Sequence, residues 1–153
     1  MSTLIHQRVE LAHEGKNLMV ICRMPSGWAV LGDRQVTSGY TVLLSDPVAP
    51  DLNALSLEDR AAYLRDMTIV GDALLEVTGA DLINYEILGN SERALHTHIV
   101  PRYADEPAEQ RRRPIWFMGM ENAPQFDLER DRELMDRIAQ AIQKRLNHLE
   151  TDN

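Results

Sequence analysis

The chain has 153 residues, of which 44% are hydrophobic and 26% charged, so it is long enough to fold as one globular domain with a sizeable core. Its formal net charge of -8 argues against sequence-independent binding to DNA or RNA, which requires many basic side chains. The single cysteine excludes an internal disulfide, and the lack of a signal-peptide pattern or a long apolar run predicts a cytoplasmic protein without a membrane span.

The first third of the chain predicts one helix and three strands. Apolar and polar residues mix from about Thr3 to His13 in a pattern typical of a short amphipathic helix. An apolar run with the single cysteine, Cys22, then indicates a buried strand, and Pro25-Ser26-Gly27 provides a turn to its hairpin partner. The three expected strands cover residues 18–22, 28–31 and 40–44.

A long helix is expected next. Ser56 and Asp59 resemble a capping box, which predicts that the helix begins there and runs to about Val77. Apolar residues recur along it at spacings of three and four, and these should face the core: Leu64, Met67, Val70, Leu74 and Val77.

Two further strands and a final helix complete the prediction. Residues 81–88 alternate between apolar and polar types, as a strand does, and the turn at Gly89-Asn90 leads to a second alternating run. The five strands are expected to form an antiparallel meander with the long helix on one face and the last strand at the edge. After residue 104 the chain is polar, and Asp127 is placed to cap a C-terminal helix.

The last predicted strand carries the most distinctive chemistry, in the stretch ALHTHIVPRY from Ala94 to Tyr103. In a strand, His96 and His98 point to the same face with their Cα atoms ~7 Å apart, and Pro101 should stop the ladder. A preceding turn with Asn90 and Ser91 could line an anion site with them. Two such histidines are also compatible with a buried structural pair or with metal ligands, although a stable metal site would need further ligands.

This stretch resembles the signature of the histidine triad (HIT) family of nucleotide hydrolases and transferases, His-φ-His-φ-His-φ-φ, which Pro-Arg often follows. Aligned on Pro101-Arg102, the three histidine positions hold Ala94, His96 and His98. The resemblance implies that His96 is the nucleophile that attacks an α-phosphate and that His98 contacts the phosphate. The chain resembles the diadenosine polyphosphate hydrolase-like branch of the family, with the first triad histidine replaced by Ala94.

The resemblance extends loosely from about Leu18 to Tyr103. Many family members have Gly-Gln-Ser/Thr in the turn, so Asn90 and Ser91 are implied to contact the phosphate or the leaving group. Near the third strand, Tyr40 replaces the histidine of the family's Pro-Gly-His motif. By the same analogy, Asp33 is a candidate for binding ribose hydroxyls or is a solvated turn residue. Arg102 is a candidate for the anion site because it lies just past the end of the histidine strand.

The resemblance implies an α+β fold: a HIT-like antiparallel sheet of about five strands with a long crossing helix and a C-terminal helix. Residues 1–153 would be a single domain with a core at about 18–103 and a C-terminal segment and helix at about 104–150. The implied activity is cleavage at the α-phosphate of a dinucleoside polyphosphate or nucleoside phosphoramidate through a nucleotidyl-histidine. The alternative is a HIT-fold nucleotide-binding protein with weak or no activity.

The implied partners are a small nucleotide and a second copy of the chain in a homodimer, with no nucleic-acid polymer and no membrane. No protein-bound cofactor or metal is required, although a divalent metal could accompany the substrate. Two features outside the motif remain open. Arg111-Arg112-Arg113 could hold distal phosphates or be solvated, and Trp116 could pack on the sheet, pack on a partner subunit or stack on a base.

Overall fold

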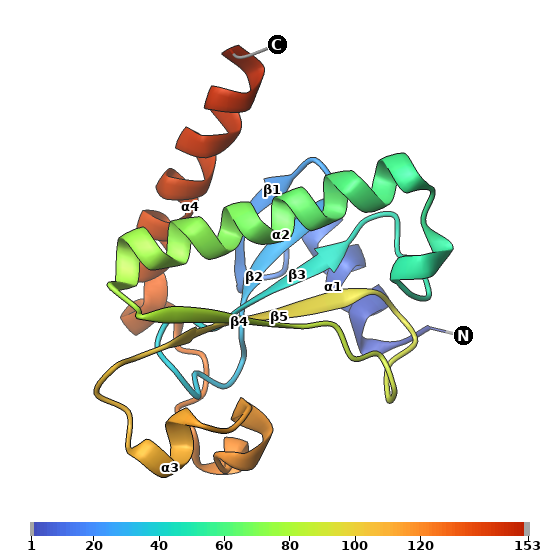
Figure 1. The fold of residues 1–153 in the computed structure, drawn as a ribbon. Helices are drawn as coiled ribbons and strands as arrows, with labels where there is room; N and C mark the ends of the chain where they lie inside the picture. Colours follow the sequence, from blue (N-terminus) through green and yellow to red (C-terminus); the bar gives the residue numbers. More distant parts are fainter. Residues whose placement is uncertain (1, 152–153) are drawn as a thin grey trace.

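The computed structural model describes residues 2–151, which form an α+β fold built on a five-stranded antiparallel sheet (Figure 1). The strand order is β1-β2-β3-β5-β4. The sheet is formed by β1 (Val20–Met24), β2 (Gly27–Leu31), β3 (Thr41–Ser45), β4 (Leu82–Glu86) and β5 (His96–Arg102). The described helices of at least four residues are α1 (Leu4–His13), α2 (Leu57–Thr78), α3 (Ala108–Arg111) and α4 (Leu128–Thr151).

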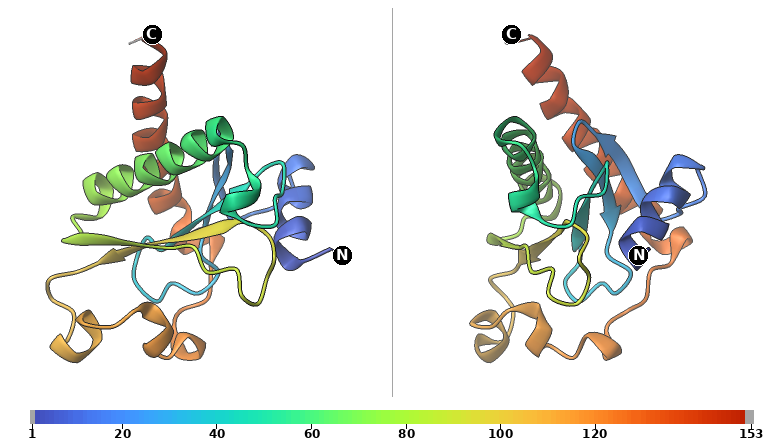
Figure 2. Two further views of the ribbon diagram at one scale, coloured as in Figure 1. Left: turned by 45° about the vertical axis from the view of Figure 1, so that its right-hand side comes forward. Right: turned by 90° about the vertical axis from the view of Figure 1, so that its right-hand side faces the viewer.

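The helices lie on both faces of the sheet (Figure 2). Helices α2 and α4 pack together on one face, where residues such as Tyr63, Leu74 and Ile138 form the larger core cluster. On the other face α1 forms a smaller cluster that contains Ile5, Tyr40 and Val100, and the segment after β5 contributes Ile115 to it. Every second residue of a strand faces the same side, so the sheet divides the side chains of β5 between these two environments.

The predicted α+β class and the five strands are confirmed, but the predicted meander is wrong. β5 lies between β3 and β4, so the histidine strand is an interior strand, and the two edge strands are β1 and β4. The prediction that Pro101 stops the ladder is also wrong, because Pro101 pairs with Ile83 of β4. Proline is tolerated there because the β3 ladder ends at the Thr41↔Ile99 pair, so no β3 residue is opposite Pro101.

The long helix α2 begins and ends close to the predicted residues. The Ser56 side chain accepts a hydrogen bond from the backbone N–H of Asp59, and Gly79 ends the helix in a left-handed conformation with φ 70°. The buried face is rotated slightly from the predicted stripe. Val70 and Leu74 are fully buried as predicted, Leu64, Met67 and Val77 are partly buried, and the centre of the face is formed by Tyr63, Asp66, Val70, Ala73 and Leu74.

The two terminal helices also match their predictions. Thr3 caps α1 in a reciprocal capping box with His6, and the Asp127 side chain accepts a hydrogen bond from the backbone N–H of Arg130 at the start of α4. Along α4, Ile138, Ile142 and Leu146 are buried at intervals of four. Figure 1 shows the C-terminal end of α4 extending beyond the sheet. None of the helices in residues 2–151 combines the length and apolar character that a membrane span requires.

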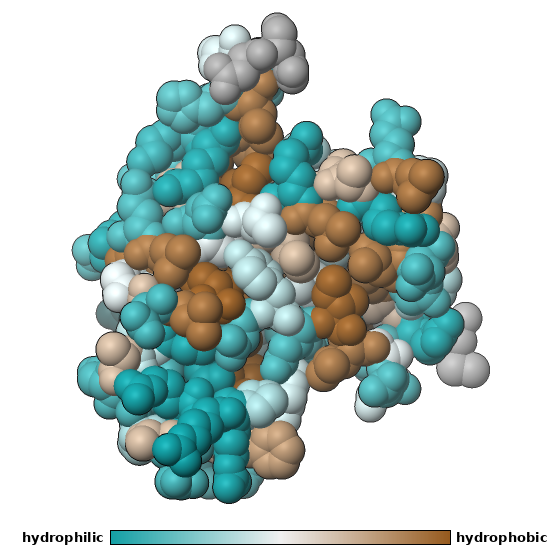
Figure 3. Space-filling view, in the orientation of Figure 1, coloured by the Kyte–Doolittle hydropathy of each residue, from teal (hydrophilic) through white to brown (hydrophobic). Residues whose placement is uncertain are grey.

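Apolar side chains also reach the surface, where they form separate patches between polar regions (Figure 3). Edge strand β4 and the segment that follows it expose three of them, Leu82, Tyr85 and Leu88. An edge strand also leaves one row of backbone hydrogen-bonding groups without a neighbouring strand.

Candidate functional site

The site is built on the face of β5 that points away from α2. Thr97 points toward α2, where its hydroxyl lies 2.6 Å from the Tyr63 hydroxyl, so His96 and His98 occupy the opposite face. Their ring centroids are 5.0 Å apart and the planes are nearly perpendicular, at 81°. The sequence prediction that the two imidazoles lie side by side is therefore confirmed.

The local hydrogen bonding of His96 fixes its protonation pattern. The imidazole is buried, and its Nδ1 lies 2.7 Å from the backbone carbonyl oxygen of Ala94. Because a carbonyl oxygen can only accept a hydrogen bond, Nδ1 must carry the proton. In the neutral ring Nε2 then keeps an unprotonated lone pair, which is the form that a nucleophilic histidine requires.

His98 lies between two aromatic side chains. The Tyr40 hydroxyl is 2.6 Å from His98 Nδ1, and the Trp116 ring meets the imidazole edge to face at a centroid distance of 4.7 Å. Burial, with a smaller contribution from neighbouring His96, lowers the pKa of His98 from 6.5 to about 4. His98 is therefore neutral at pH 7.

The two histidines open into a cavity of about 290 Å³. The turn that joins β4 to β5 forms one wall and the segment after β5 forms the other, so the lining combines Leu88, Gly89, Asn90, Ser91, Glu92, His96, His98 and Trp116. Four of the six site residues expected from sequence thus meet at one cavity: Asn90, Ser91, His96 and His98. Trp116, whose position the sequence left open, is a fifth lining residue.

Asp33 is not brought to this cavity. Its side chain is exposed, and it accepts a hydrogen bond at 3.0 Å from Arg8 of α1. It lies in the loop between β2 and β3, whose backbone also pairs with residues just before α4, since Asp33 O accepts from Phe126 N. Asp33 therefore contacts α1 through Arg8 and does not lie against the histidines.

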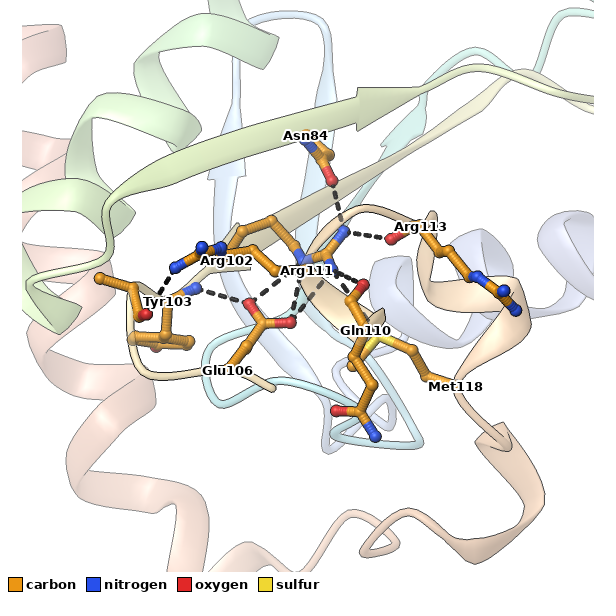
Figure 4. A network of polar contacts seen from close by, with 9 residues as sticks. Asn84, Arg102, Tyr103, Glu106, Gln110, Arg111, Arg113 and Met118 are labelled. Atoms are coloured by element: carbon orange, nitrogen blue, oxygen red, sulfur yellow. Dashed lines mark hydrogen bonds and ion pairs between the residues drawn. The ribbon is translucent and has the colours of Figure 1, made fainter. Parts of the chain in front are cut away.

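Arg102 is also separate from the cavity, although it lies on the same strand (Figure 4). Its guanidinium is buried and bonds with Glu106, the Asn84 side chain and the backbone carbonyls of Gln110 and Arg113. These acceptors use all five N–H groups of the arginine. Arg102 therefore has no free N–H donor for the expected anion-site role in this conformation.

The arginine triplet lies beside this network. Arg111 donates to the backbone carbonyl of Ala104, and Arg112 lies 3.8 Å from Glu109 on the surface. With part of β4 the three arginines line a shallow groove that is distinct from the histidine cavity.

Sequence reasoning missed the roles of Tyr40 and Glu86 near His98. The sequence identifies Tyr40 only as a replacement for a family histidine. It does not reveal the contact between Tyr40 and His98, which are 58 positions apart. Glu86 is the cross-strand partner of His98 in β4, and its Oε2 is buried without a hydrogen-bond partner among the described residues. Only the strand register places Glu86 opposite His98, and the sequence does not reveal that register.

No group of three or more His, Cys, Asp or Glu side chains within residues 2–151 is arranged to hold a metal ion. Asp105, the acidic residue that follows the histidine strand, does not complete such a group with His96 and His98.

The fold matches solved structures of histidine triad proteins. A histidine triad (HIT) protein from Sinorhizobium meliloti superposes with a TM-score of 0.70 at 25% identity, over 80% of this chain and 88% of that one. A histidine triad protein from Marinobacter aquaeolei gives a TM-score of 0.70 at 18% identity, over 82% of this chain and 88% of that one.

A hypothetical histidine triad nucleotide-binding protein from Sulfolobus tokodaii also superposes with a TM-score of 0.70, at 15% identity over 90% of this chain and 92% of that one. Neither a protein-family model nor a curated protein matches the sequence. The HIT fold is thus established by structural similarity.

Proposed function

We propose that this protein belongs to the HIT family and is a nucleotide hydrolase or transferase that cleaves at the α-phosphate of a dinucleoside polyphosphate or nucleoside phosphoramidate. One observation carries the proposal. The Ala94 carbonyl accepts a hydrogen bond from Nδ1 of His96, so Nε2 of this cavity-lining histidine keeps a free lone pair. The proposal of a nucleotide substrate is supported by the HIT fold and by the Sulfolobus neighbour, which is described as nucleotide-binding.

In the proposed first step, His96 Nε2 forms a bond to the α-phosphorus. The bond from phosphorus to the bridging oxygen or nitrogen breaks, and its electron pair departs with the leaving group; an amine leaving group must also gain a proton. The Nδ1 proton stays on the ring, hydrogen-bonded to the Ala94 carbonyl. The covalent histidine intermediate divides one difficult displacement into two easier ones.

In the second step, a water oxygen bonds to the phosphorus and loses a proton to bulk solvent while the phosphorus–nitrogen bond breaks. The electron pair returns to His96 Nε2, which restores the enzyme and releases a nucleoside monophosphate. The turn residues Asn90 and Ser91 line the same cavity and carry hydrogen-bonding side chains for phosphoryl oxygens. His98 is neutral at pH 7, so it would act by hydrogen bonding rather than as a cation.

The second candidate function is nucleotide binding without chemistry. Ala94, at the first position of the motif, is buried in the core cluster that contains Tyr40 and has no ring to offer the site. If that missing imidazole is needed for turnover, the cavity would still bind a nucleotide.

A time course with diadenosine tetraphosphate and with an adenosine phosphoramidate distinguishes the two functions. We expect wild type to release AMP, His96→Ala to lose this activity, and intact mass to show a transient adenylyl adduct on wild type alone. The matched control is His148→Ala, which removes an exposed histidine of α4. Nucleotide binding with no product and no adduct would favour the binding protein, and neither binding nor turnover would refute both.

The homodimer is a further part of the proposal. Edge strand β4 and the segment after it expose Leu82, Tyr85 and Leu88, which supports association through this edge. Light scattering coupled to size-exclusion chromatography should give twice the monomer mass, and Leu82→Lys should reduce it to the monomer mass. A monomeric wild type at micromolar concentration would contradict this association.

A further inference from the structure

Tyr40 is buried against the histidine pair. It is 3% exposed, lies immediately before β3, and directs its hydroxyl to His98 Nδ1 at 2.6 Å. The described residues offer the hydroxyl oxygen no other hydrogen-bond partner. This contact therefore accounts for the polar atom of a side chain that otherwise packs among apolar residues.

The direction of this hydrogen bond follows from the protonation of both groups. Burial, with smaller effects from Asp33 and Glu86, raises the pKa of Tyr40 well above its ordinary value, so the phenol keeps its proton. A buried O–H needs an acceptor, and an unprotonated His98 Nδ1 is the one available. If Nδ1 carried a proton instead, the phenolic hydrogen would be buried without a partner, at a cost of about 1–3 kcal/mol.

The surroundings of Tyr40 are shaped around its ring. A Cβ atom at Gly32 would lie 2.9 Å from the Tyr40 ring, so only glycine leaves the ring its present space. Gln35 fixes the backbone on the other side, because its Nε2 donates to the carbonyl oxygens of Gly32 and Tyr40, both at 2.9 Å. The ring and the backbone of Tyr40 are therefore both held in position.

We propose that Tyr40 is a positioning residue that donates to His98 Nδ1 and so holds His98 as the tautomer with its proton on Nε2. His96 and His98 are then opposite tautomers: the first offers a lone pair at Nε2, and the second offers an N–H at Nε2. The tautomer assignment stands on the contacts above, whereas its use in phosphate binding rests on the proposed function. In that function the His98 N–H would donate to a phosphoryl oxygen while His96 attacks.

Nitrogen-15 NMR of histidine-labelled protein near pH 7 tests this inference directly, because protonated and unprotonated ring nitrogens have well-separated chemical shifts. In wild type we expect His98 to be protonated at Nε2 and His96 at Nδ1. In Tyr40→Phe, which removes only the hydroxyl, we expect His98 to move to averaged shifts of two tautomers while His96 is unchanged. Tyr103→Phe is the matched control, because its hydroxyl donates to the Ser38 carbonyl away from the cavity.

A wild-type His98 protonated at Nδ1 would overturn the proposal even if the variant failed to fold, and so would an unchanged His98 tautomer in Tyr40→Phe. If wild type has activity, Tyr40→Phe should also lower kcat/KM roughly two- to tenfold, the equivalent of one ordinary hydrogen bond. The expected tautomers in a protein with no turnover would support the role of Tyr40 and refute the proposed function. The two failures are therefore distinguishable.

Discussion

Arg102→Ala should be among the most destabilising single substitutions in this protein. Arg102 and Glu106 form a buried ion pair at 3.0 Å, with side chains 4% and 9% exposed. Removing the arginine leaves the Glu106 carboxylate buried without its cation and takes the donor from the Asn84 side chain. Breaking a buried pair in this way typically costs about 3–5 kcal/mol.

The lower end of that range is expected here. The carbonyl oxygens of Gln110 and Arg113 also lose their donor, but both residues lie in an exposed segment where water can replace it. The loss of about 3 kcal/mol in the free energy of unfolding would be a large part of the roughly 5–15 kcal/mol of an ordinary domain. Urea denaturation of wild type and variant, followed by circular dichroism, measures it from the shift in midpoint.

The chain provides a matched control on the same surface segment. Arg112 lies 3.8 Å from Glu109, and both side chains are more than three-quarters exposed at 77% and 78%. Arg112→Ala should therefore change stability by less than about 1 kcal/mol. A loss below about 1 kcal/mol for Arg102→Ala, similar to that control, would refute the reasoning. The double variant Arg102→Met with Glu106→Gln should recover part of the lost stability, because no buried charge is left unpaired.

Three further predictions concern the sheet and the site. The pKa of His98 is about 4 in the folded protein and 6.5 in the unfolded chain, so the unfolded state binds more protons between these values and stability falls as pH drops from about 6.5 to 4. The loss of stability from His98 reaches up to about 3 kcal/mol. His98→Gln should show a correspondingly smaller fall in urea titrations across this range. Gly27→Ala should cost at least about 2 kcal/mol, because its Cβ would overlap the Leu44 carbonyl oxygen in β3; Gly79→Ala, whose Cβ meets open space but whose left-handed backbone costs about 1–2 kcal/mol, is the thermal-unfolding control for backbone strain alone, and a larger loss there would contradict the overlap argument. Tyr63→Phe should lower the free energy of unfolding by about 1–3 kcal/mol, since it removes the buried hydroxyl that contacts Thr97 and the Leu43 carbonyl; a melting temperature equal to that of wild type would show that these groups find other partners.

Local sequence patterns predicted the elements of this fold well. The alternation around His96 and His98 gave the correct face for both imidazoles, and Ser56 correctly marked the start of α2. The strand order was predicted incorrectly because it depends on contacts between distant segments. Nothing in the residues of β3 or β4 indicates that β5 inserts between them.

The site was predicted only as far as its residues lie close together in the sequence. Asn90 and Ser91 precede the histidine strand directly, and they do line its cavity. Arg102 shares the face of the histidines, but it lies four residues beyond His98, ~13 Å along a strand, and Glu106 is its nearer partner. The Tyr40 contact could not be predicted because it depends on how β3 is aligned with β5.

The interior position of β5 also has a consequence for the dynamics of the site. His98 and Ile99 are paired with both β3 and β4, so their backbone amides should exchange with solvent only when the sheet unfolds. Residues 104–126 contain only short helical pieces and are largely exposed, so they should open by local unfolding at a much lower free energy. The imidazoles thus stand on one of the slowest-exchanging strands, whereas the wall that carries Trp116 is expected to open at a lower free energy and to expose His98 when it does.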